Sequence, residues 1–204
     1  MKPYAFLILL LSLIYYGIAQ PPKKDEWYII ARATRSKAAI IYNNFNLFDS
    51  TISHVGFAKQ NNSGNFYVYH INPVNNVNAF IVDSLEGFLS PPDIFCYSLW
   101  RLSLTIKESN KLKKFVESYL CVKVEFDFDF DLNNSYNKLY CSEFVWLGLN
   151  AAGLTSKPWY KNLKESNLKY FLEREEIYYI PPDFFENLPF VNLMRREFFK
   201  QGTN

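Results

Sequence analysis

Alternating apolar and polar positions along this chain predict several β-strands. Segments rich in β-branched and aromatic residues lie at 27–30, 54–58, 66–71, 96–106 and 177–180. The polar run KQNNSGN at 59–65 is typical of a turn. The strands on either side of it should therefore form an antiparallel hairpin, and a turn centred in this run would place His54 directly opposite His70.

Apolar residues at helical spacing predict two main helices. In 107–121, Leu112, Phe115, Val116 and Tyr119 share one face. Segment 141–152 is apolar nearly all round, as buried helices are, and ends before Gly153 at a C-cap position. Shorter helical pieces are predicted at 36–43, at 83–89 with Asp83 as the cap, at 161–175, and as a last turn or helix from 181–185.

Segment 122–132, VKVEFDFDFDL, alternates strictly between apolar and polar residues. This predicts a strand or extended arm, with Asp127, Asp129 and Asp131 together on a solvated face. The whole order of elements predicts an α+β domain, in which a mainly antiparallel sheet packs against helices.

The first nineteen residues have the pattern of a secretory signal peptide. Lys2 provides the positive charge, residues 4–16 are apolar, and Gly17 and Ala19 are small residues before a cleavage site at Gln20. A retained anchor is the alternative, although the apolar run is short for a spanning helix. We expect an exported protein, periplasmic or extracellular, with a linker at 20–26 and one domain at 27–204.

The composition indicates neither a nucleic-acid partner nor a cofactor. The net charge is only +2, and the chain has no Gly-rich phosphate-binding motif. Zinc held by His54, His70 and Cys141 is an alternative, but the paired Cys or His spacings of zinc motifs are missing. The alternating aspartates lack the Gly and the terminal Glu of a calcium loop. We therefore expect no metal.

Three cysteines occur in the chain, an odd number for an exported protein. A disulfide between Cys96 and Cys121 would leave Cys141 free. The alternative is that Cys96 and Cys121 are both small buried hydrophobic residues.

Cys141 is the candidate nucleophile. At the N-terminus of a buried helix, unpaired backbone N–H groups and the helix dipole lower the pKa of a thiol. The same N–H groups can hold the oxyanion of a tetrahedral intermediate. A thiol nucleophile also needs a base and an orienting group, and His54 and His70 are placed to serve. A buried structural thiol and two ordinary hairpin histidines are the alternatives.

These segments resemble a known family. The motifs SHVG at 53–56, YVYH at 67–70 and LYCSEFV at 139–145 are similar to those of the circularly permuted papain-like cysteine hydrolases, and most similar to the YiiX/YebB-like branch of the NlpC superfamily. The resemblance covers roughly residues 27–185 and includes WRL at 100–102, FDF at 126–128 and PPD at 181–183.

The resemblance implies a permuted papain-like fold, with His54 as the base and Cys141 as the nucleophile. The third polar position falls on His70. Many YiiX-like members carry Glu there, so His70 resembles instead the lecithin:retinol acyltransferase-like branch. A His can orient the first imidazole, but it does not stabilise an imidazolium by a full charge. Tyr140 is a weaker candidate for lining the pocket.

The implied activity is that of a thiol hydrolase, which cleaves an amide or ester bond through an acyl-enzyme. The substrate would be a small-molecule, peptide or lipid amide. A cell-wall peptide fits an exported NlpC relative and would associate the protein with the cell envelope, whereas an acyl or lipid amide fits the acyltransferase-like kin. The alternative is a non-catalytic binding module that keeps the fold. The sequence gives no indication of the oligomeric state.

Overall fold

The computed structural model describes residues 26–36, 39, 43–73, 78–130, 132, 137–154, 156–164, 166 and 168–199. The predicted signal peptide at 1–19, the linker apart from Glu26, and most of the predicted helix at 36–43 lie outside the described residues. Within the described part, every helix is too short or too polar to cross a bilayer.

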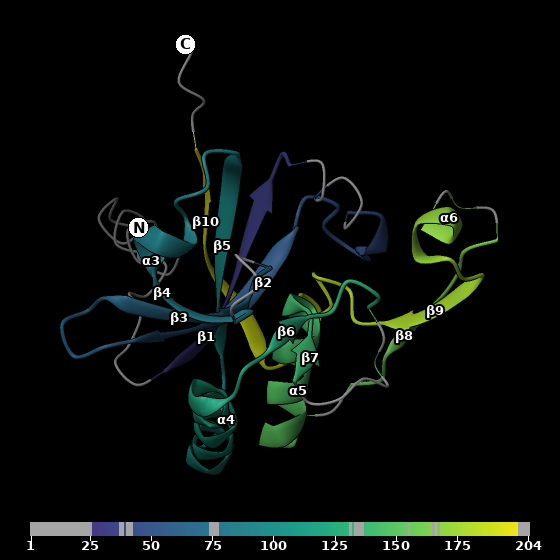
Figure 1. Cartoon of the computed structure of the whole chain (residues 1–204). Helices are drawn as coiled ribbons and strands as arrows, with labels where there is room; N and C mark the ends of the chain where they lie inside the picture. Colours follow the sequence, from purple (N-terminus) through teal and green to yellow (C-terminus); the bar gives the residue numbers. More distant parts are fainter. Residues whose placement is uncertain are drawn as a thin grey trace, which may run out of the picture.

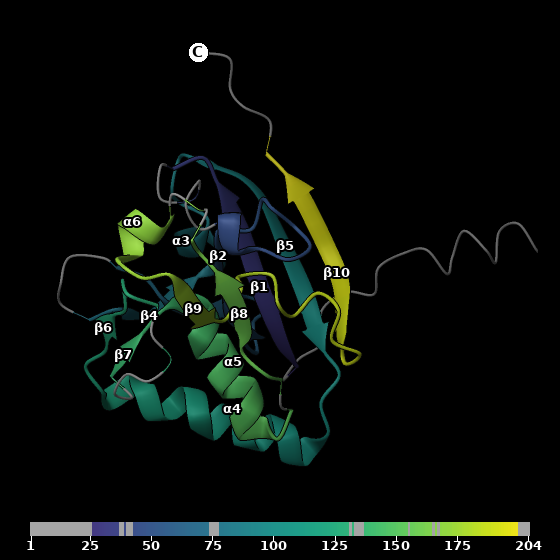
Figure 2. The same ribbon diagram turned by 90° about the vertical axis from the view of Figure 1, so that its right-hand side faces the viewer.

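The centre of the molecule is a six-stranded antiparallel sheet, with the strand order β10-β5-β1-β2-β3-β4. Figure 2 shows β10 beside β5 at one edge of this sheet. The α+β class and the mainly antiparallel sheet are confirmed. The strands are β1 (Trp27–Thr34), β2 (His54–Gln60), β3 (Phe66–Ile71), β4 (Phe80–Ser84), β5 (Ile94–Leu102) and β10 (Val191–Phe198).

Apolar residues cover both faces of the sheet, because alternate residues of its central strands point to opposite sides. Ile29 and Phe57 belong to the larger core, which also contains the apolar residues of the two main helices. Tyr28 and Ile30 belong to a smaller core, together with Phe88. The central strands are therefore buried on both sides.

Two helices, α4 (Ile106–Ser118) and α5 (Cys141–Ala152), cover the face with the larger core. They lie side by side below the sheet in Figure 1, and α5 packs directly on β2. A capping box at Thr105 starts α4, and Gly153, in the left-handed region at φ 96°, ends α5. Both predicted helices are confirmed within a few residues.

The shorter elements lie around this frame. The helical pieces are η1 (Asn43–Phe45), α3 (Leu85–Phe88), η2 (Tyr119–Cys121) and α6 (Leu168–Leu172). The two small sheets are a parallel pair, β6 (Glu125–Phe126) with β7 (Lys138–Leu139), and an antiparallel pair, β8 (Trp159–Asn162) with β9 (Glu176–Tyr179).

The prediction of a long strand or arm at 122–132 was wrong. Only β6 pairs there, and the chain then turns, with Phe130 at a φ of 53°. Asp127 is fully buried and pairs with Lys138 at 3.3 Å, whereas Asp129 is exposed. The aspartates therefore do not share one solvated face, and Asp131 lies outside the described residues.

Two other sequence predictions need correction, and one strand was not predicted. The predicted helix at 161–175 is helical only in α6, because β8 and β9 pair around it. The C-terminal strand β10 was not predicted. The helix near 83–89 starts after Ser84, whose hydroxyl accepts the Gly87 N–H at 3.1 Å, so Asp83 is not the cap.

Candidate active site

The start of α5 is tied to the segment that follows β9. The Ser142 hydroxyl donates to the Ile180 carbonyl at 2.7 Å, and the Tyr140 hydroxyl accepts the Ile180 N–H at 2.9 Å. The Glu143 carboxylate accepts the Tyr140 N–H at 3.4 Å. These contacts fix the position of Cys141, the first residue of the helix.

Cys141 and His54 line the same cavity, which has a volume of about 160 Å³. The apolar residues of its lining include Phe45, Pro73, Phe126, Phe130, Ile180 and Pro182. The polar residues include Arg32 and the hydroxyls of Thr34, Ser36 and Ser53, where Thr34 contacts the other two at 3.1–3.2 Å. The cavity is therefore amphipathic, with the thiol and an imidazole in its wall.

Tyr140 both lines this cavity and belongs to the larger core. It is only 2% exposed, and burial raises its pKa well above the usual range. Its hydroxyl therefore stays protonated at neutral pH, and its ring packs on Phe130 with centroids 5.1 Å apart.

The two histidines are neighbours, although not in the predicted register. His70 lies opposite Gly56, not opposite His54. The reason is the loop at 61–65, where the Asn61 side chain accepts two backbone N–H groups and so pairs Gln60 with Phe66. The shift makes the histidines diagonal neighbours on one face of the sheet.

Gly56 allows this diagonal contact. A Cβ at Gly56 would lie 2.8 Å from the His70 Cβ and 2.7 Å from the Tyr69 carbonyl oxygen. With only hydrogen there, β3 approaches closely, and the distance between His54 Nε2 and His70 Nδ1 is 2.8 Å.

Asp83, at the end of β4, extends this pair to a chain of three side chains. The distance between His70 Nε2 and Asp83 Oδ2 is 3.0 Å, and the Asp83 side chain is about one-third exposed. Sequence reasoning missed this residue because it assigned Asp83 to a helix cap. An acidic residue on the strand after the His70 strand was the available signal.

The Asp83 carboxylate determines which nitrogens carry protons. A carboxylate only accepts hydrogen bonds, so His70 Nε2 must donate to it. Neutral His70 then has a lone pair on Nδ1, which accepts the N–H of His54 Nε2. This leaves His54 Nδ1 unprotonated, as a general base requires; the tautomers are assigned from the hydrogen bonds.

The electrostatics of the site keep both imidazoles neutral. Burial lowers the pKa of His54 well below 6.5, and the charges of Arg32 and His70 lower it further. Burial also lowers the pKa of His70, against the opposing effect of its hydrogen bond to Asp83. That hydrogen bond in turn lowers the pKa of Asp83, so its carboxylate is ionised at neutral pH.

The sequence predicted a lowered pKa for the Cys141 thiol, but the environment of the thiol raises it. Cys141 is 9% exposed, and its burial raises the thiol pKa above the usual range. The backbone N–H groups of Val55 and Ser142, and the charge of Arg32, act in the opposite direction but are outweighed. The resting site therefore holds a neutral thiol and a neutral imidazole.

Arg32 is a second residue that sequence reasoning missed. It lies directly opposite His54 in the pairing of β1 with β2, and only 7% of it is exposed. Its guanidinium stacks 4.6 Å from the centroid of the Phe88 ring, which also contacts both histidines. Only the strand register brings Arg32 to His54.

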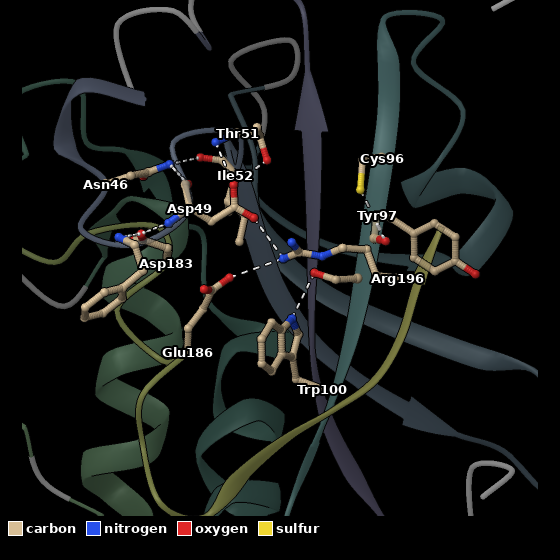
Figure 3. Close-up of polar contacts among 12 residues, drawn as sticks. Asn46, Asp49, Thr51, Ile52, Cys96, Tyr97, Trp100, Asp183, Glu186 and Arg196 are labelled. Carbon is tan, nitrogen blue, oxygen red and sulfur yellow. Dashed lines mark hydrogen bonds and ion pairs between the residues drawn. The ribbon is translucent and has the colours of Figure 1, made fainter. Parts of the chain in front are cut away.

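Asp183 holds the loop that connects Phe45 and Ser53, two residues that line the cavity. Its buried carboxylate accepts the backbone N–H groups of Leu47, Phe48 and Asp49 at 2.5–3.0 Å, as Figure 3 shows in part. Because Phe45, at the end of η1, lines the cavity and precedes this loop, the segment after β9 supports both the start of α5 and this lining residue.

Strand β10 fastens the same loop from the other side. Arg196 Nη2 contacts Asp49 at 2.8 Å and Glu186 at 3.4 Å, and these side chains converge in Figure 3. Burial and the negative charge of Asp49 raise the pKa of Glu186 to about 7. The C-terminal strand is therefore coupled electrostatically to this loop.

All three cysteines are free. Cys96 is buried, in agreement with the small-hydrophobe alternative, but Cys121 is exposed and does not fit it. The suggested disulfide between them is not formed.

No protein-family model matches this chain, and no functionally curated protein matches it. Among solved structures, the chain is similar to the crystal structure of metalloprotein YiiX from Escherichia coli O157:H7, DUF1105, with a TM-score of 0.64. The chain shares the fold of YiiX. The sequences are 21% identical over 88% of this chain and all of YiiX, so the likeness establishes the fold alone.

Proposed function

We propose that this protein is a thiol hydrolase of permuted papain-like type, with Cys141 as the nucleophile and His54 as the base. The observation that carries this proposal is the shared cavity of Cys141 and His54, with His54 held by His70 and Asp83. A nucleophile, a base and an orienting chain are the parts that covalent catalysis of acyl transfer requires.

In the first half of the reaction, His54 Nδ1 takes the thiol proton as the sulfur of Cys141 attacks the substrate carbonyl. The C–S bond forms and the carbonyl becomes an oxyanion. Its collapse breaks the C–N or C–O bond, and the leaving group takes the proton from His54. Water, activated by His54, then attacks the thioester, and release of the acid restores the thiol.

Asp83 supplies the full negative charge that His70 lacks. When His54 is protonated, its Nε2–H points to His70 Nδ1, and His70 Nε2 donates to the carboxylate. The positive charge is thereby stabilised through two hydrogen bonds. His70 and Asp83 act through His54, so they are positioning residues.

Backbone N–H groups near the sulfur are suited to bind the oxyanion. Hydrogen bonds from the backbone N–H groups of Val55, Ser142 and Cys141 lower the pKa of the Cys141 thiol. These donors therefore face the sulfur and can stabilise negative charge that develops beside it. The first N–H groups of a helix have no partner within it.

YiiX is described as a metalloprotein, but the described residues of this chain do not offer a set of ligands for a metal ion. The described residues contain no group of three or more His, Cys, Asp or Glu side chains placed to hold a metal ion. Both nitrogens of His70 are already used by His54 and Asp83. We therefore assign no step to a metal.

We propose two substrate classes, a peptide amide of the cell wall and an acyl or lipid amide, for a protein exported by residues 1–19. N-terminal sequencing of the protein from its native host tests the export proposal. A mature chain starting at Gln20 supports it, and a chain that retains residues 1–19 contradicts it.

Acyl-enzyme trapping tests the catalytic proposal. The protein is mixed with p-nitrophenyl acetate and p-nitrophenyl octanoate, quenched in acid and mapped by mass spectrometry. We expect acylation of Cys141 and its loss in Cys141→Ala and His54→Ala. Cys121→Ser, which removes the exposed thiol, is the matched control and should keep the rate.

A binding module that has lost its chemistry is the second candidate. The specific observation in its favour is the buried, protonated thiol of Cys141. If Cys141 is acylated no faster than Cys121, and His54→Ala does not slow it, the hydrolase proposal fails and the binding module remains.

A further inference from the structure

A buried charge is normally paired with an opposite charge, because leaving it unpaired in a protein interior is unfavourable. Arg32 departs from this rule. Cys141, Asp93 and Asp83 act on it only as longer-range charges, the thiol of Cys141 is protonated at rest, and no carboxylate of the described residues forms an ion pair with it. The cavity therefore holds a guanidinium without a partner anion.

The hydrogen bonds of Arg32 leave one edge of its guanidinium without a partner. The Nη1 group donates to the Phe88 carbonyl, the only acceptor that the described residues offer it. The Nε–H is buried and has no partner. The remaining Nε and Nη2 edge carries two parallel N–H groups, which is the fork that binds a carboxylate in bidentate fashion.

The orientation of Arg32 is fixed rather than adaptable. The ring of Phe88 lies under the guanidinium, and the strand pairing places Arg32 opposite His54. The same Phe88 ring stacks on the His54 ring, with centroids 5.6 Å apart, and Arg32 is near enough to Cys141 for its charge to lower the thiol pKa. An anion bound to Arg32 is therefore close to the proposed base and to the carbonyl under attack.

We propose that Arg32 binds a carboxylate of the substrate, close to the scissile bond. The inference rests on the proposed function and deepens it, because it defines the substrate class as amides or esters of an amino acid with a free carboxylate. The cavity of about 160 Å³ resembles in size one of about 150 Å³ that holds benzene. It accommodates one residue-sized group, whose apolar part can contact lining residues such as Phe45 and Ile180.

Binding to a protein without the nucleophile tests this proposal. The scaffold is the full chain with Cys141→Ala, and the probes are N-acetyl-L-alanine and N-acetyl-L-alaninamide, which have the same shape and differ in charge. Isothermal titration should show the acid bound about tenfold or more tighter than the amide. Equal affinities, or no measurable binding of the acid, would overturn the proposal.

Arg32 variants on the same scaffold assign the preference to this residue. Arg32→Gln should abolish the acid-to-amide ratio, and Arg32→Lys should keep only part of it, since a lysine has charge but no fork. Circular dichroism checks that both variants are folded. If Arg32→Gln is not folded, the Arg32→Lys variant decides. An acid-to-amide affinity ratio that is unchanged in Arg32→Lys contradicts a role for the two parallel N–H groups of the guanidinium.

Two larger probes distinguish the source of the carboxylate. N-octanoyl-L-alanine represents an acylated amino acid, and acetyl-Gly-Gly-L-alanine represents the end of a peptide. Tighter binding of either acid than of its own amide supports the subsite, and the ratio between the two acids identifies the source. Loss of the carboxylate preference overturns this inference alone, whereas absence of acylation at Cys141 overturns the hydrolase and leaves the subsite.

Discussion

At the scale of single residues, the tautomers of the two imidazoles depend on Asp83, three side chains away from the thiol. Its carboxylate makes His70 donate through Nε2, and His70 in turn makes His54 present an unprotonated Nδ1. Replacing Asp83 by an uncharged residue of the same shape should therefore weaken His54 as the proposed base, while the side chains of the site keep their places.

Asp83→Asn is expected to slow acylation of Cys141 about tenfold or more, within the contribution of about 10²–10⁴ that general-base catalysis makes. The cause is that an amide nitrogen can donate to His70 and so permits the wrong tautomer. Glu86→Gln, on the neighbouring helix α3, is the matched control and should retain the rate. Nitrogen-15 NMR of the histidines reads the tautomers directly; unchanged tautomers and an unchanged rate would contradict the role of Asp83.

The pH dependence of Cys141 alkylation is a second prediction at this scale. Burial raises the thiol pKa, so the rate with iodoacetamide should stay low at neutral pH and increase only above the free-thiol value of about 8.5. Exposed Cys121 in the same protein serves as the internal reference for reagent access. Rapid alkylation of Cys141 at neutral pH would show that the N–H groups and Arg32 outweigh burial.

At the scale of elements, the close approach of α5 to β2 holds the thiol at the sheet. Gly148 lies at the contact, where a Cβ would come within 2.5–2.7 Å of the Phe57 ring and 3.1 Å of Leu112. The predicted helix has no local reason for a glycine at this position, since glycine weakens helices. Its presence is explained by packing between elements.

Gly148→Ala is expected to destabilise the protein, with a net loss of up to about 2 kcal/mol in the free energy of unfolding. Helix propensity alone favours alanine by about 1 kcal/mol, whereas overpacking costs about 1–3 kcal/mol. The sign of the change in urea denaturation therefore decides between the two effects. A stabilised variant would mean that Phe57 moves aside easily.

At the scale of the whole molecule, segments far apart in the chain meet around one cavity. The contacts of Asp183 and Arg196 join the loop at 43–53, the segment after β9 and strand β10 (Figure 3). Ser142 and Tyr140 join the start of α5 to the same segment at Ile180. The site depends on the complete fold, so its electrostatics also contribute to the pH dependence of stability.

Glu186 provides the prediction at this scale. Its folded pKa of about 7 lies above its ordinary value of 4.5, so its contribution to stability is complete below about pH 4.5 and is lost as pH rises through 7. Glu186→Gln should therefore gain stability relative to the unsubstituted protein between about pH 5 and pH 8. The buried histidines act in the opposite direction, so the measured quantity is the difference between the two proteins in urea unfolding.

Glu117→Gln, at an exposed residue that pairs with Lys113 on α4, is the matched control for this measurement. It gives the baseline for replacing an exposed glutamate by glutamine. A difference for Glu186→Gln that stays constant between about pH 5 and pH 8 would contradict the raised pKa.

Local patterns in the sequence were sufficient for the class of the fold and for the position of Cys141. Helix periodicity, the C-cap Gly153 and the polar turn at 59–65 are short-range signals, which act within one or two turns of chain. They correctly placed α4, α5 and the hairpin of β2 and β3. They also brought His54 and His70 together, although in the wrong register.

The sequence by itself thus determined the α+β class, the antiparallel hairpin and a cysteine at the start of a buried helix. Only the tertiary structure decided the roles of Asp83 and Arg32, the burial that raises the pKa of Cys141, and the place of β10 beside β5. The physical reason is that these features depend on strand register and on desolvation by residues distant in the chain. Neither is encoded by the neighbours of a residue in the sequence.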